Sequence, residues 1–411
     1  MSGFLSSMVG ATYASAAAPL SPGYYLYTQS TGETQSNGIF DGQVAVMGYN
    51  SDGTIRAAYT GNSTSSTQGF IKPILFNPST NAITFGTKVN CQQYTSSVIY
   101  GLKTVSETEY SIGTADATNY GITYLPNNNS PGPLVSVYPF SMDSTGAVTV
   151  GTYATLSLTN VGTAAAATDI AFDGLYGGVP RYTLFSRYDF GSANMYAISR
   201  SANTLSITRA FNSSFGTGSR AVAEASFAGV GEASGIFLNT GIDVSAATFG
   251  ATTRNSAGLA TGIGGVFPNL VLITSGTSAK YMIYGSNSGG TTMTSRIINA
   301  TYSASVTPTV SLGSSLYQEN ASTRTSQTYK LVKSWNTNEA FLFFIESNTL
   351  KVKTATVSGD TITWSSATSI GALTATSFDI MTARVDAANQ YFMGVSSDAG
   401  NTTAFAVRLQ A

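Results

Sequence analysis

Asn81-Ala82-Ile83-Thr84-Phe85 is a short phrase that the chain repeats: a polar turn residue, an aliphatic residue, Thr or Ser, and a further apolar or extended residue. The other copies are Gly146–Val150, Thr204–Arg209, Thr309–Leu312 and Asp360–Trp364. Counted from Ile83, their aliphatic positions follow at steps of 65, 59, 103 and 52 residues. The third step is close to two periods, so we expect a degenerate copy inside it. Self-similarity at a fixed period of this length predicts a repeat architecture.

A second marker has the same period. Apolar runs that end in small or polar residues precede the phrase, and the last two intervals between them are 60 and 50 residues. The runs are Val44–Tyr49, Tyr182–Ser186, Tyr281–Gly285, Phe341–Ile345 and Tyr391–Val395. Two independent markers therefore share one repeat unit.

The composition of the unit indicates its structure. The runs hold four to seven residues of Val, Ile, Thr, Tyr and Phe, bounded by Gly, Asn, Ser and Asp, which is typical of strands and turns. Helical repeats are excluded, because apolar residues at i, i+3, i+4 and i+7 are almost absent. Leu350–Val357 alternates apolar and polar residues, as a strand with one solvated face does, and leads through a turn into Thr361–Trp364. The sequence predicts an all-β propeller built from four-stranded blades.

Counting the repeats gives the number of blades. Copies begin near residues 44, 109, 182, 236, 281, 341 and 391, which predicts seven blades. Six is the alternative, because the copies at Tyr110–Ile112 and Ile236–Leu238 are weak. The chain stops two strands into the last copy, and Tyr24–Thr28 can supply the missing outer strand. Pairing both ends of the chain in one blade would close the ring and remove an open edge. We therefore expect a leader at residues 1–22 and a propeller at residues 23–411.

The amino-acid composition excludes or disfavours several kinds of binding and catalytic site. Charged residues make up only 9% of the chain and the formal net charge is −1, so binding to a nucleic-acid polyanion is disfavoured. The chain has no histidine, which removes His-based catalysis and imidazole metal sites. Its single cysteine, Cys91, allows neither a disulfide nor a cysteine metal cluster. We expect no cofactor, no metal and a surface of Ser, Thr, Asn, Gln and Tyr.

The N-terminal segment is apolar and uncharged. No Lys or Arg occurs before Arg56, so a secretory signal is disfavoured, and the segment is too short and interrupted to span a bilayer. One interpretation is an anchor peptide that docks on a partner. The alternative is a tail packed on its own propeller. The anchoring candidates are Phe4, Leu5, Met8 and Val9.

The first dozen residues, Met1–Thr12, resemble the start shared by structural proteins of tailed phages, including marine and cyanobacterial ones. The rest of the chain is not covered by this resemblance. It implies a virion protein, with a leader that binds other virion proteins and a variable body that faces outward. It carries no catalytic residue with it.

Within that interpretation, we expect a non-enzymatic adhesion protein that contacts a bacterial surface glycan or another virion protein. Aromatic rings would stack on sugars and amides would bind hydroxyl groups. For each Trp the competing interpretation is a residue that packs between blades. The candidate contacts are Trp335, Trp364, Tyr120, Tyr124 and Asn128.

Two alternatives remain in view: a propeller glycoside hydrolase, and a secreted or surface binding propeller of a cell. A hydrolase needs paired carboxylates, or the sialidase combination of Tyr, an acid and an Arg cluster. Ser358–Trp364 and Ser141–Gly146 only faintly resemble sialidase Asp-box turns. The nearby acidic groupings are Asp169 with Asp173, Glu107 with Glu109, and Asp189 beside Arg187. Most of these are explained as turn residues or solvated ends, so we predict no enzyme.

Overall fold

The computed structural model describes most of residues 23–410. The described ranges are 23–34, 42–62, 69–91, 103–108, 113–127, 134–157, 168–176, 178–187, 192–214, 222–227, 233–239, 243–249, 254–260, 269–286, 292–303, 306–320, 328–386 and 388–410. The leader with its candidates Phe4, Leu5, Met8 and Val9, the weak copy at 110–112, and Asn128 lie outside these ranges.

The described residues form seven antiparallel sheets, which we number as blades in chain order. Blade 1 contains β2 (Gly42–Tyr49), β3 (Ile55–Asn62), β4 (Gly69–Asn77), β5 (Ala82–Phe85) and β6 (Val89–Asn90). Blade 2 contains β7 (Lys103–Ser106), β8 (Asn119–Asn127), β9 (Leu134–Met142), β10 (Val148–Val150) and β11 (Ala154–Ser157). Blade 3 contains β12 (Thr168–Tyr176), β13 (Val179–Arg187), β14 (Ser192–Ser201) and β15 (Thr204–Ser214).

The remaining four blades complete the set. Blade 4 contains β16 (Val222–Phe227), β17 (Ala233–Asn239), β18 (Asp243–Phe249) and β19 (Arg254–Ala260). Blade 5 contains β20 (Asn269–Thr274), β21 (Ser278–Ser286), β22 (Thr292–Ser303) and β23 (Val306–Asn320). Blade 6 contains β24 (Tyr329–Lys333), β25 (Glu339–Glu346), β26 (Thr349–Ser358), β27 (Thr361–Trp364) and β28 (Thr368–Ala372). Blade 7 joins β29 (Ser377–Val385), β30 (Asn389–Asp398) and β31 (Asn401–Gln410) to β1 (Gly23–Thr34).

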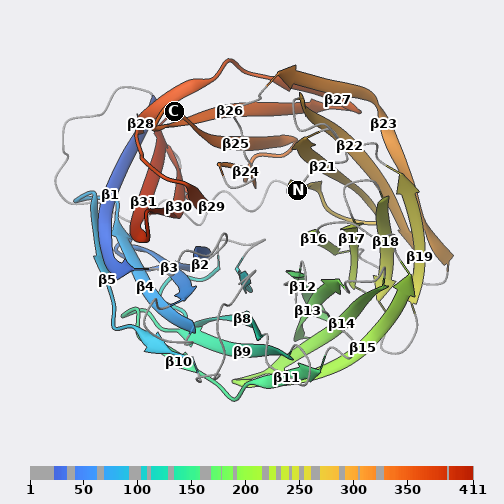
Figure 1. The fold of residues 1–411 in the computed structure, drawn as a ribbon, viewed down its shortest axis with the longest axis horizontal. Coiled ribbons are helices and arrows are strands. Elements are labelled where there is room, and N and C mark those ends of the chain that lie inside the picture. The colour runs from blue at the N-terminus through green and yellow to red at the C-terminus, as the bar shows by residue number, and fades with distance from the viewer. Residues whose placement is uncertain are drawn as a thin grey trace.

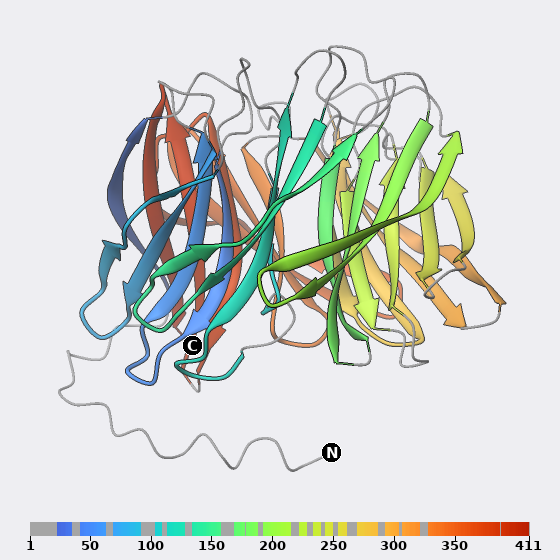
Figure 2. The ribbon, with the colours of Figure 1, turned by 90° about the horizontal axis from the view of Figure 1, so that it is seen from below.

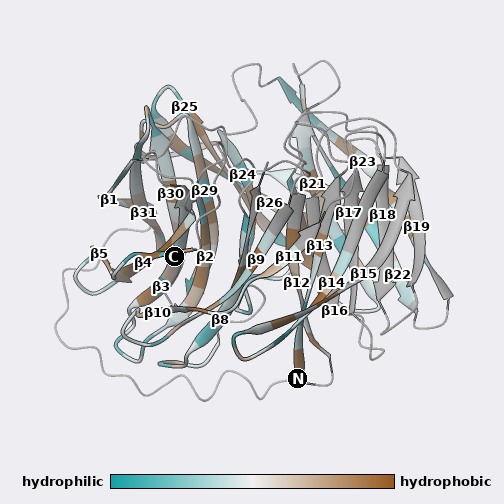
Figure 3. Ribbon diagram, turned by 60° about the horizontal axis from the view of Figure 1, so that its bottom comes forward, coloured by the Kyte–Doolittle hydropathy of each residue, from teal (hydrophilic) through white to brown (hydrophobic). Residues whose placement is uncertain are grey.

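The blades form a closed ring around a central axis (Figure 1). The innermost strands β2, β7, β12, β16, β20, β24 and β29 each contact the next, and β29 contacts β2 again. The hydrophobic core is divided among the junctions, because five of the six described clusters of buried side chains join the facing sides of two blades, and the sixth lies within blade 5. Val44 and Ile74 of blade 1, for example, pack with Met393 and Ala404 of blade 7. Figure 3 shows such hydrophobic residues on strands in the body of the ring. The prediction of a propeller with seven blades is confirmed.

The N-terminal strand closes the ring as predicted. β1 pairs with β31 in antiparallel register, with Tyr24 opposite Leu409 and Thr28 opposite Phe405. One detail differs: the C-terminal end of the chain contributes three strands to blade 7, not two.

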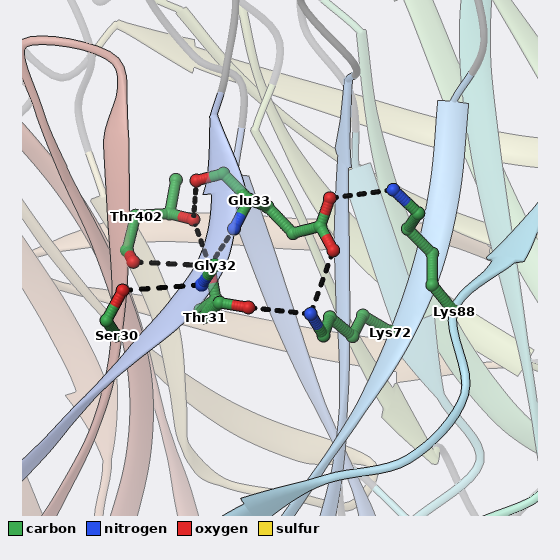
Figure 4. A network of polar contacts seen from close by, with 7 residues as sticks. All are labelled: Ser30, Thr31, Gly32, Glu33, Lys72, Lys88 and Thr402. Carbon is green, nitrogen blue, oxygen red and sulfur yellow. Dashed lines mark hydrogen bonds and ion pairs between the residues drawn. The ribbon is translucent and has the colours of Figure 1, made fainter.

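Polar contacts fasten the far end of β1 to both of its neighbours (Figure 4). Within blade 7, the Thr402 hydroxyl donates to the carbonyl oxygen of Glu33 at 2.9 Å, and the hydroxyls of Thr31 and Thr402 are also in contact. Toward blade 1, the Glu33 carboxylate accepts from Lys72 at 2.8 Å and from Lys88 at 2.7 Å. β1, the strand that closes the ring, is therefore also bound to blade 1. We call the ion pairs of Glu33 with Lys72 and Lys88 the latch on β1.

Side chains also complete the hydrogen bonds of the innermost strands, whose edge toward the axis has no pairing strand. The Val44 N–H donates to the nearly buried Asp379 carboxylate of blade 7 at 3.0 Å, and Lys330 of blade 6 lies 2.7 Å from the same carboxylate. The Thr108 hydroxyl donates to the Val46 carbonyl at 2.7 Å. These contacts pair buried backbone groups that would otherwise be unsatisfied.

The repeated phrase corresponds to the outermost strand of a blade. Its five copies lie in β5, β10, β15, β23 and β27. β19 is the outermost strand of blade 4 and takes the place of the expected degenerate copy, and β1 takes that place in blade 7. The second marker is less uniform. Four of its runs lie in second strands of their blades, but Val44–Tyr49 lies in the first strand of blade 1.

In blades 1, 2 and 5 a turn of the next blade packs against the outermost strand just after the phrase. In blades 1, 2 and 6 the outer layer is split into two short strands around residues 86–88, 151–153 and 365–367. A Cβ atom on Gly151 would lie 2.2 Å from the backbone oxygen of Asn203, in the turn of blade 3. A Cβ atom on Gly313 would lie 3.0 Å from the Cβ atom of Asp360, which is in the turn of blade 6. Glycine is needed here because a neighbouring turn occupies the space.

The strand order gives the ring two different ends. One end, the hairpin face, carries the turns between first and second strands and between third and fourth strands. The opposite end, the connector face, is where second strands end, third strands begin and fourth strands end. β31 ends and β1 begins at the hairpin face, since Gly23 pairs with Gln410. This end lies at the bottom of Figure 2, where the C-terminus is marked.

Candidate functional site

The junction between blades 5 and 6 brings one predicted residue, Trp364, into a mixed aromatic and polar cluster. Trp364 is the last residue of β27 and is half-buried. The tight turn at Gly359, where φ is +59°, reverses β26 into β27 and places Trp364 opposite Ala355. Its ring centroid lies 5.9 Å from those of Tyr284 and Tyr317 in blade 5. Its indole N–H donates to the Ser295 hydroxyl at 3.2 Å.

An ion pair lies beside these rings. The Lys353 ammonium is 2.6 Å from the Glu319 carboxylate, and it lies 5.6 Å from the ring centroid of Tyr317 and 5.9 Å from that of Trp364. The Tyr284 hydroxyl donates to the other oxygen of Glu319 at 2.8 Å. The negative charge of Glu319 is thus balanced by Lys353, and its carboxylate serves as a hydrogen-bond acceptor.

Toward the hairpin face the same junction has a polar rim. The Asp360 carboxylate accepts from the Asn299 amide at 3.0 Å and lies 3.5 Å from the Lys280 ammonium. The hydroxyls of Ser315 and Thr361 are 3.3 Å apart. Hydroxyl, amide and paired charges therefore continue outward from two half-buried aromatic rings. We call the set of Trp364, Tyr317, Glu319, Lys353 and Ser295 the 5/6 cluster.

The other predicted contacts do not join this cluster. Tyr124 is fully buried in the core between blades 2 and 3, so it offers no ring face to a ligand. Tyr120 is half-buried, and the Arg200 guanidinium lies 3.9 Å from its ring centroid. Trp335 lies between β24 and β25, at the hairpin face of blade 6, and its buried indole N–H has no hydrogen-bond partner. The sequence candidates are therefore spread over different blades.

One described group resembles the sialidase combination in residue type. The Tyr182 hydroxyl donates to Glu107 at 2.6 Å, and Arg200 binds the same carboxylate, with Nη2 2.8 Å from Oε2. Tyr182 is fully buried, and burial together with the adjacent carboxylate raises its pKa well above 10. A nucleophilic phenolate is therefore unfavourable here. The group instead joins blade 2 to blade 3.

The Asp-box resemblances are turns. Ser141–Gly146 spans the turn from β9 to β10, where the Asp143 carboxylate accepts from the backbone N–H groups of Thr145 and Ala147, both at 2.9 Å. Ser358–Trp364 forms the hairpin of β26 and β27. The side chains of Glu109, Asp169, Asp173 and Asp189 lie outside the described part of the chain.

A fully buried guanidinium joins blades 1 and 2. Arg56 donates to the carbonyl oxygens of Asp143 at 2.6 Å, Ala117 at 2.7 Å, Met142 at 3.2 Å and Tyr49 at 3.4 Å. Four neutral acceptors surround it, so it is a structural clamp and not a site for an anionic ligand.

Three further findings bear on chemistry. No three acidic, Cys or His side chains gather as metal ligands among the residues that the structure describes. Cys91 is buried, which raises the pKa of its thiol to about 12 and leaves it unreactive. The described ranges contain no helix with the length and apolar character needed to cross a membrane.

Sequence reasoning missed Tyr317, Glu319, Lys353 and Ser295. A signal was present for three of them. Tyr317 and Glu319 are two residues apart on β23 and so share one side of the strand, and Lys353 belongs to the alternating run in β26. The sequence does not show that side chains of these two strands, which belong to different sheets, pack against each other across a blade junction.

Comparisons with known proteins find only solved structures that are distant in sequence from this chain. No protein-family model and no curated protein matches the chain. Among solved structures, a lectin from Aleuria aurantia, described as a six-bladed β-propeller with a novel fucose recognition mode, is 12% identical with a TM-score of 0.45, covering 82% of this chain and 97% of its own. AofleA from Arthrobotrys oligospora is 7% identical with a TM-score of 0.47, covering 92% and 85%. The S. cerevisiae core factor structure is 12% identical with a TM-score of 0.50, covering 96% and 62%. At these identities the likeness concerns the fold alone, and the seven sheets described here differ from the six blades of the Aleuria lectin.

Proposed function

We propose that this chain is a non-enzymatic binding propeller that holds a glycan of low charge at the 5/6 cluster. The observation that carries the proposal is the pair of half-buried rings, Trp364 and Tyr317, lying between two blades and bordered by hydroxyl, amide and paired charged groups. Aromatic faces contact the apolar faces of sugar rings, and the polar border can bind sugar hydroxyls.

The surface chemistry supports a neutral ligand. Charged residues are 9% of the chain, and the Glu319 and Asp360 carboxylates of this junction are both paired with lysines. Such a site has no strong net field with which to select a polyanion. The Aleuria aurantia lectin has been solved in complex with fucosides, which are neutral sugars.

The hydrogen bonds and burial of the acidic and tyrosine side chains disfavour catalysis. A glycoside hydrolase requires two carboxyl groups facing one sugar, or a tyrosine that can ionise beside an acid. Glu319 is held by Lys353 and two tyrosine hydroxyls, and Tyr182 is buried beside Glu107. These groups fit hydrogen bonding and packing better than proton transfer.

Two biological settings accommodate this binding role. A secreted or surface-attached propeller needs only the ring and its ligand site. Attachment to a phage particle, with residues 1–22 binding other virion proteins, rests on the resemblance of Met1–Thr12 and is a separate proposal. Testing the glycan site does not depend on which setting applies.

The test is a glycan array with the full chain, followed by titration calorimetry on each hit and by an assay for reducing-sugar release. The variant Tyr317→Ala removes one ring, and Tyr153→Ala, a half-buried tyrosine at another blade junction, is the matched control. We expect wild type and the control to bind and Tyr317→Ala to lose most of the affinity, while the melting temperatures of the two variants fall by similar amounts. Absence of any glycan hit, equal binding by both variants, or release of reducing sugar would overturn the proposal.

A further inference from the structure

Glu339 differs from the other glutamates whose side chains the structure describes. It is the first residue of β25, at the hairpin face of blade 6, and it is half-buried. The other described glutamate carboxylates each have a lysine or arginine nitrogen at 2.8 Å or less; they are Glu33, Glu107, Glu319 and Glu346. Glu339 has no such partner among the described residues.

The hydrogen bonds to Glu339 come from neutral groups and use one of its two oxygens. Its Oε1 accepts from the Ser334 hydroxyl at 2.7 Å and from the Asn336 amide at 3.1 Å. Within the described ranges its Oε2 accepts no hydrogen bond. A carboxylate has about four acceptor positions, and a partly buried charge is stabilised by a cation. Glu339 therefore has both the charge and the free oxygen to bind one.

The basic residues at this end of blades 6 and 7 lie on other sides of their blades. Lys333 is on the blade 5 side, because its cross-strand partner belongs to the core between blades 5 and 6. The guanidinium of Arg384 lies over the ring of Tyr49 in blade 1. Arg408 donates to the Tyr27 hydroxyl, which is also on the blade 1 side. None of these three cations is placed to neutralise Glu339.

Threonine hydroxyls continue outward from Glu339 on the same side of blade 6. Thr356 of β26 is directly opposite Glu339, and Thr363 of β27 is directly opposite Thr356. Such partners point to one side of a sheet, about 4.5–5.5 Å apart. That side faces blade 7, because Phe341, two residues along from Glu339, packs against Phe392. Both threonines are exposed, and their hydroxyls make no hydrogen bond to the described part of the chain.

Blade 7 supplies the opposite wall with Gln390. Gln390 is only 5% exposed, and its amide N–H donates to the Ser334 hydroxyl at 3.4 Å. Its amide oxygen is buried and has no partner among the described residues. Because the Ser334 hydroxyl also binds Glu339, this oxygen lies close to the carboxylate and adds to the negative potential there. We call Glu339, Gln390, Thr356 and Thr363 the 6/7 mouth.

Tyr24 of β1 lies near the same carboxylate. The pKa of its hydroxyl is raised, first by burial and then, against the effect of a hydrogen bond with Thr354, by the negative charge of Glu339. Strand β1 thus borders the 6/7 mouth on its outer side. The described walls of the mouth are hydroxyl, amide and carboxylate groups, with no cation.

We propose that the 6/7 mouth binds the ammonium group of an amino sugar. An ammonium group has three donors and no acceptor, which suits the free oxygen of Glu339, and a charge-assisted hydrogen bond to it is of the stronger kind. The hydroxyls of Thr356 and Thr363 can both donate to and accept from sugar hydroxyls. A lysine side chain offers the same ammonium group but nothing that would use the two threonines.

This site is separate from the 5/6 cluster. Lys353 and Trp364 lie on the blade 5 side of blade 6, whereas Thr363 lies on the blade 7 side. The two sites also select ligands of different charge. The 5/6 cluster has its carboxylate paired with a lysine, but the 6/7 mouth does not.

Titration calorimetry with the full chain tests the site with three probes at mildly acidic pH, where amino groups are protonated. The first probe is a glucosamine oligomer. The second is the same oligomer fully N-acetylated, which keeps its hydroxyls but has no ammonium group. The third is Nα-acetyl-lysine amide, which has the ammonium group without the sugar. We expect the first probe to bind and the other two to bind at least about tenfold more weakly, as the loss of a charge-assisted hydrogen bond or of several neutral ones predicts.

Variants locate the binding. Glu339→Gln removes the charge with little change of shape, and Glu346→Gln, at the other end of β25, removes the same charge as a matched control. We expect Glu339→Gln to weaken glucosamine binding about tenfold or more and Glu346→Gln to leave it unchanged. Thr363→Val should weaken binding of the amino sugar without affecting its N-acetylated form. Tyr317→Ala should have no effect, so failure of this site and failure of the 5/6 cluster are distinguishable.

Three results would overturn the proposal. The first is equal binding by Glu339→Gln and Glu346→Gln. The second is equal affinity for the free and N-acetylated oligomers. The third is binding of Nα-acetyl-lysine amide as tight as that of the amino sugar and lost in Glu339→Gln, which would assign the 6/7 mouth to a lysine of a partner protein instead.

Discussion

Gly23 at the start of β1 lies opposite Gln410 at the end of β31, so the first and last described residues of the propeller are neighbours in one blade. This relationship makes blade 7 the point at which the ring can open. Every other blade is continuous along the chain, whereas blade 7 depends on a strand contributed from nearly 400 residues away in sequence. The stability of the ring should therefore respond most clearly to changes in β1.

Leu26→Asp should open the closing blade. Leu26 is half-buried against the core between blades 6 and 7 and touches Gly371. A carboxylate there would be placed in an apolar junction without a partner, which is costly. We expect a melting temperature several degrees lower by calorimetry, while the exposed Gln29→Asp on the same strand should have little effect. Equal melting of both variants would argue against closure through β1. Leu26 is a better position than Tyr25, which faces Arg408, because an acid at Tyr25 could form a new ion pair.

The latch on β1 predicts a dependence on pH. Partial burial of Glu33 acts to raise the pKa of its carboxyl, but hydrogen bonds and charge from Lys72 and Lys88 outweigh it, so the pKa lies below its ordinary value. A carboxyl with a depressed pKa in the folded state contributes stability above its unfolded pKa of about 4.3 and loses it as pH falls through the folded value. Denaturant unfolding of Glu33→Gln should therefore show weaker loss of stability between about pH 5 and pH 3 than wild type does. Identical pH profiles for the two proteins would show that the latch contributes nothing.

Gly151→Ala tests the packing of a turn on the preceding blade. The added methyl group would meet the Asn203 backbone oxygen at 2.2 Å, so one of the two blades must move. Overpacking of this kind costs about 1–3 kcal/mol. Chemical denaturation should detect that loss, and the neighbouring exposed Thr152→Ala should stay close to wild type. A fully stable Gly151→Ala protein would mean that the junction between blades 2 and 3 is looser than the structure describes.

Arg56→Met should strongly destabilise the junction between blades 1 and 2. The change removes the guanidinium donor from the carbonyl oxygens of Asp143, Met142 and Ala117, of which Ala117 keeps a second donor, the Asn119 amide, at 3.4 Å. Each buried acceptor left unpaired costs about 1–3 kcal/mol. The loss should be readily measured by denaturant unfolding. Lys280→Met, which removes a half-exposed cation at another junction, should cost about 1 kcal/mol or less. Similar losses for the two variants would contradict the clamp assigned to Arg56.

The sequence predicted the ring well because its signals are local. The phrase at Ile83, Val148, Ile207, Val310 and Ile362 marks outer strands, where short strand and turn patterns repeat in every blade. Closure followed from the missing fourth strand and from the Tyr24–Thr28 run. The outer strands are marked by residues close together in the chain, and closure follows from the number of strands. Both can therefore be read from the sequence without knowing which blades are in contact.

The candidate site was harder to predict because it is formed between blades. Lys353 was assigned to a solvated side of β26, but that side faces blade 5 and lies against Tyr317 and Trp364. Tyr124 has the residue type expected at a sugar site, yet strand alternation directs it into the core between blades 2 and 3. In a propeller both sides of a blade can be covered, so polar alternation alone does not indicate solvent.

The glycan site can be read out from a single residue. The chain has only two tryptophans, so Trp335→Phe leaves Trp364 as the sole source of tryptophan fluorescence. Titrating this variant with a glycan that binds wild type should produce a saturable change in emission, with a dissociation constant that matches calorimetry. Binding of the same glycan at wild-type affinity with no change in Trp364 emission would contradict the assignment of the ligand to the junction between blades 5 and 6.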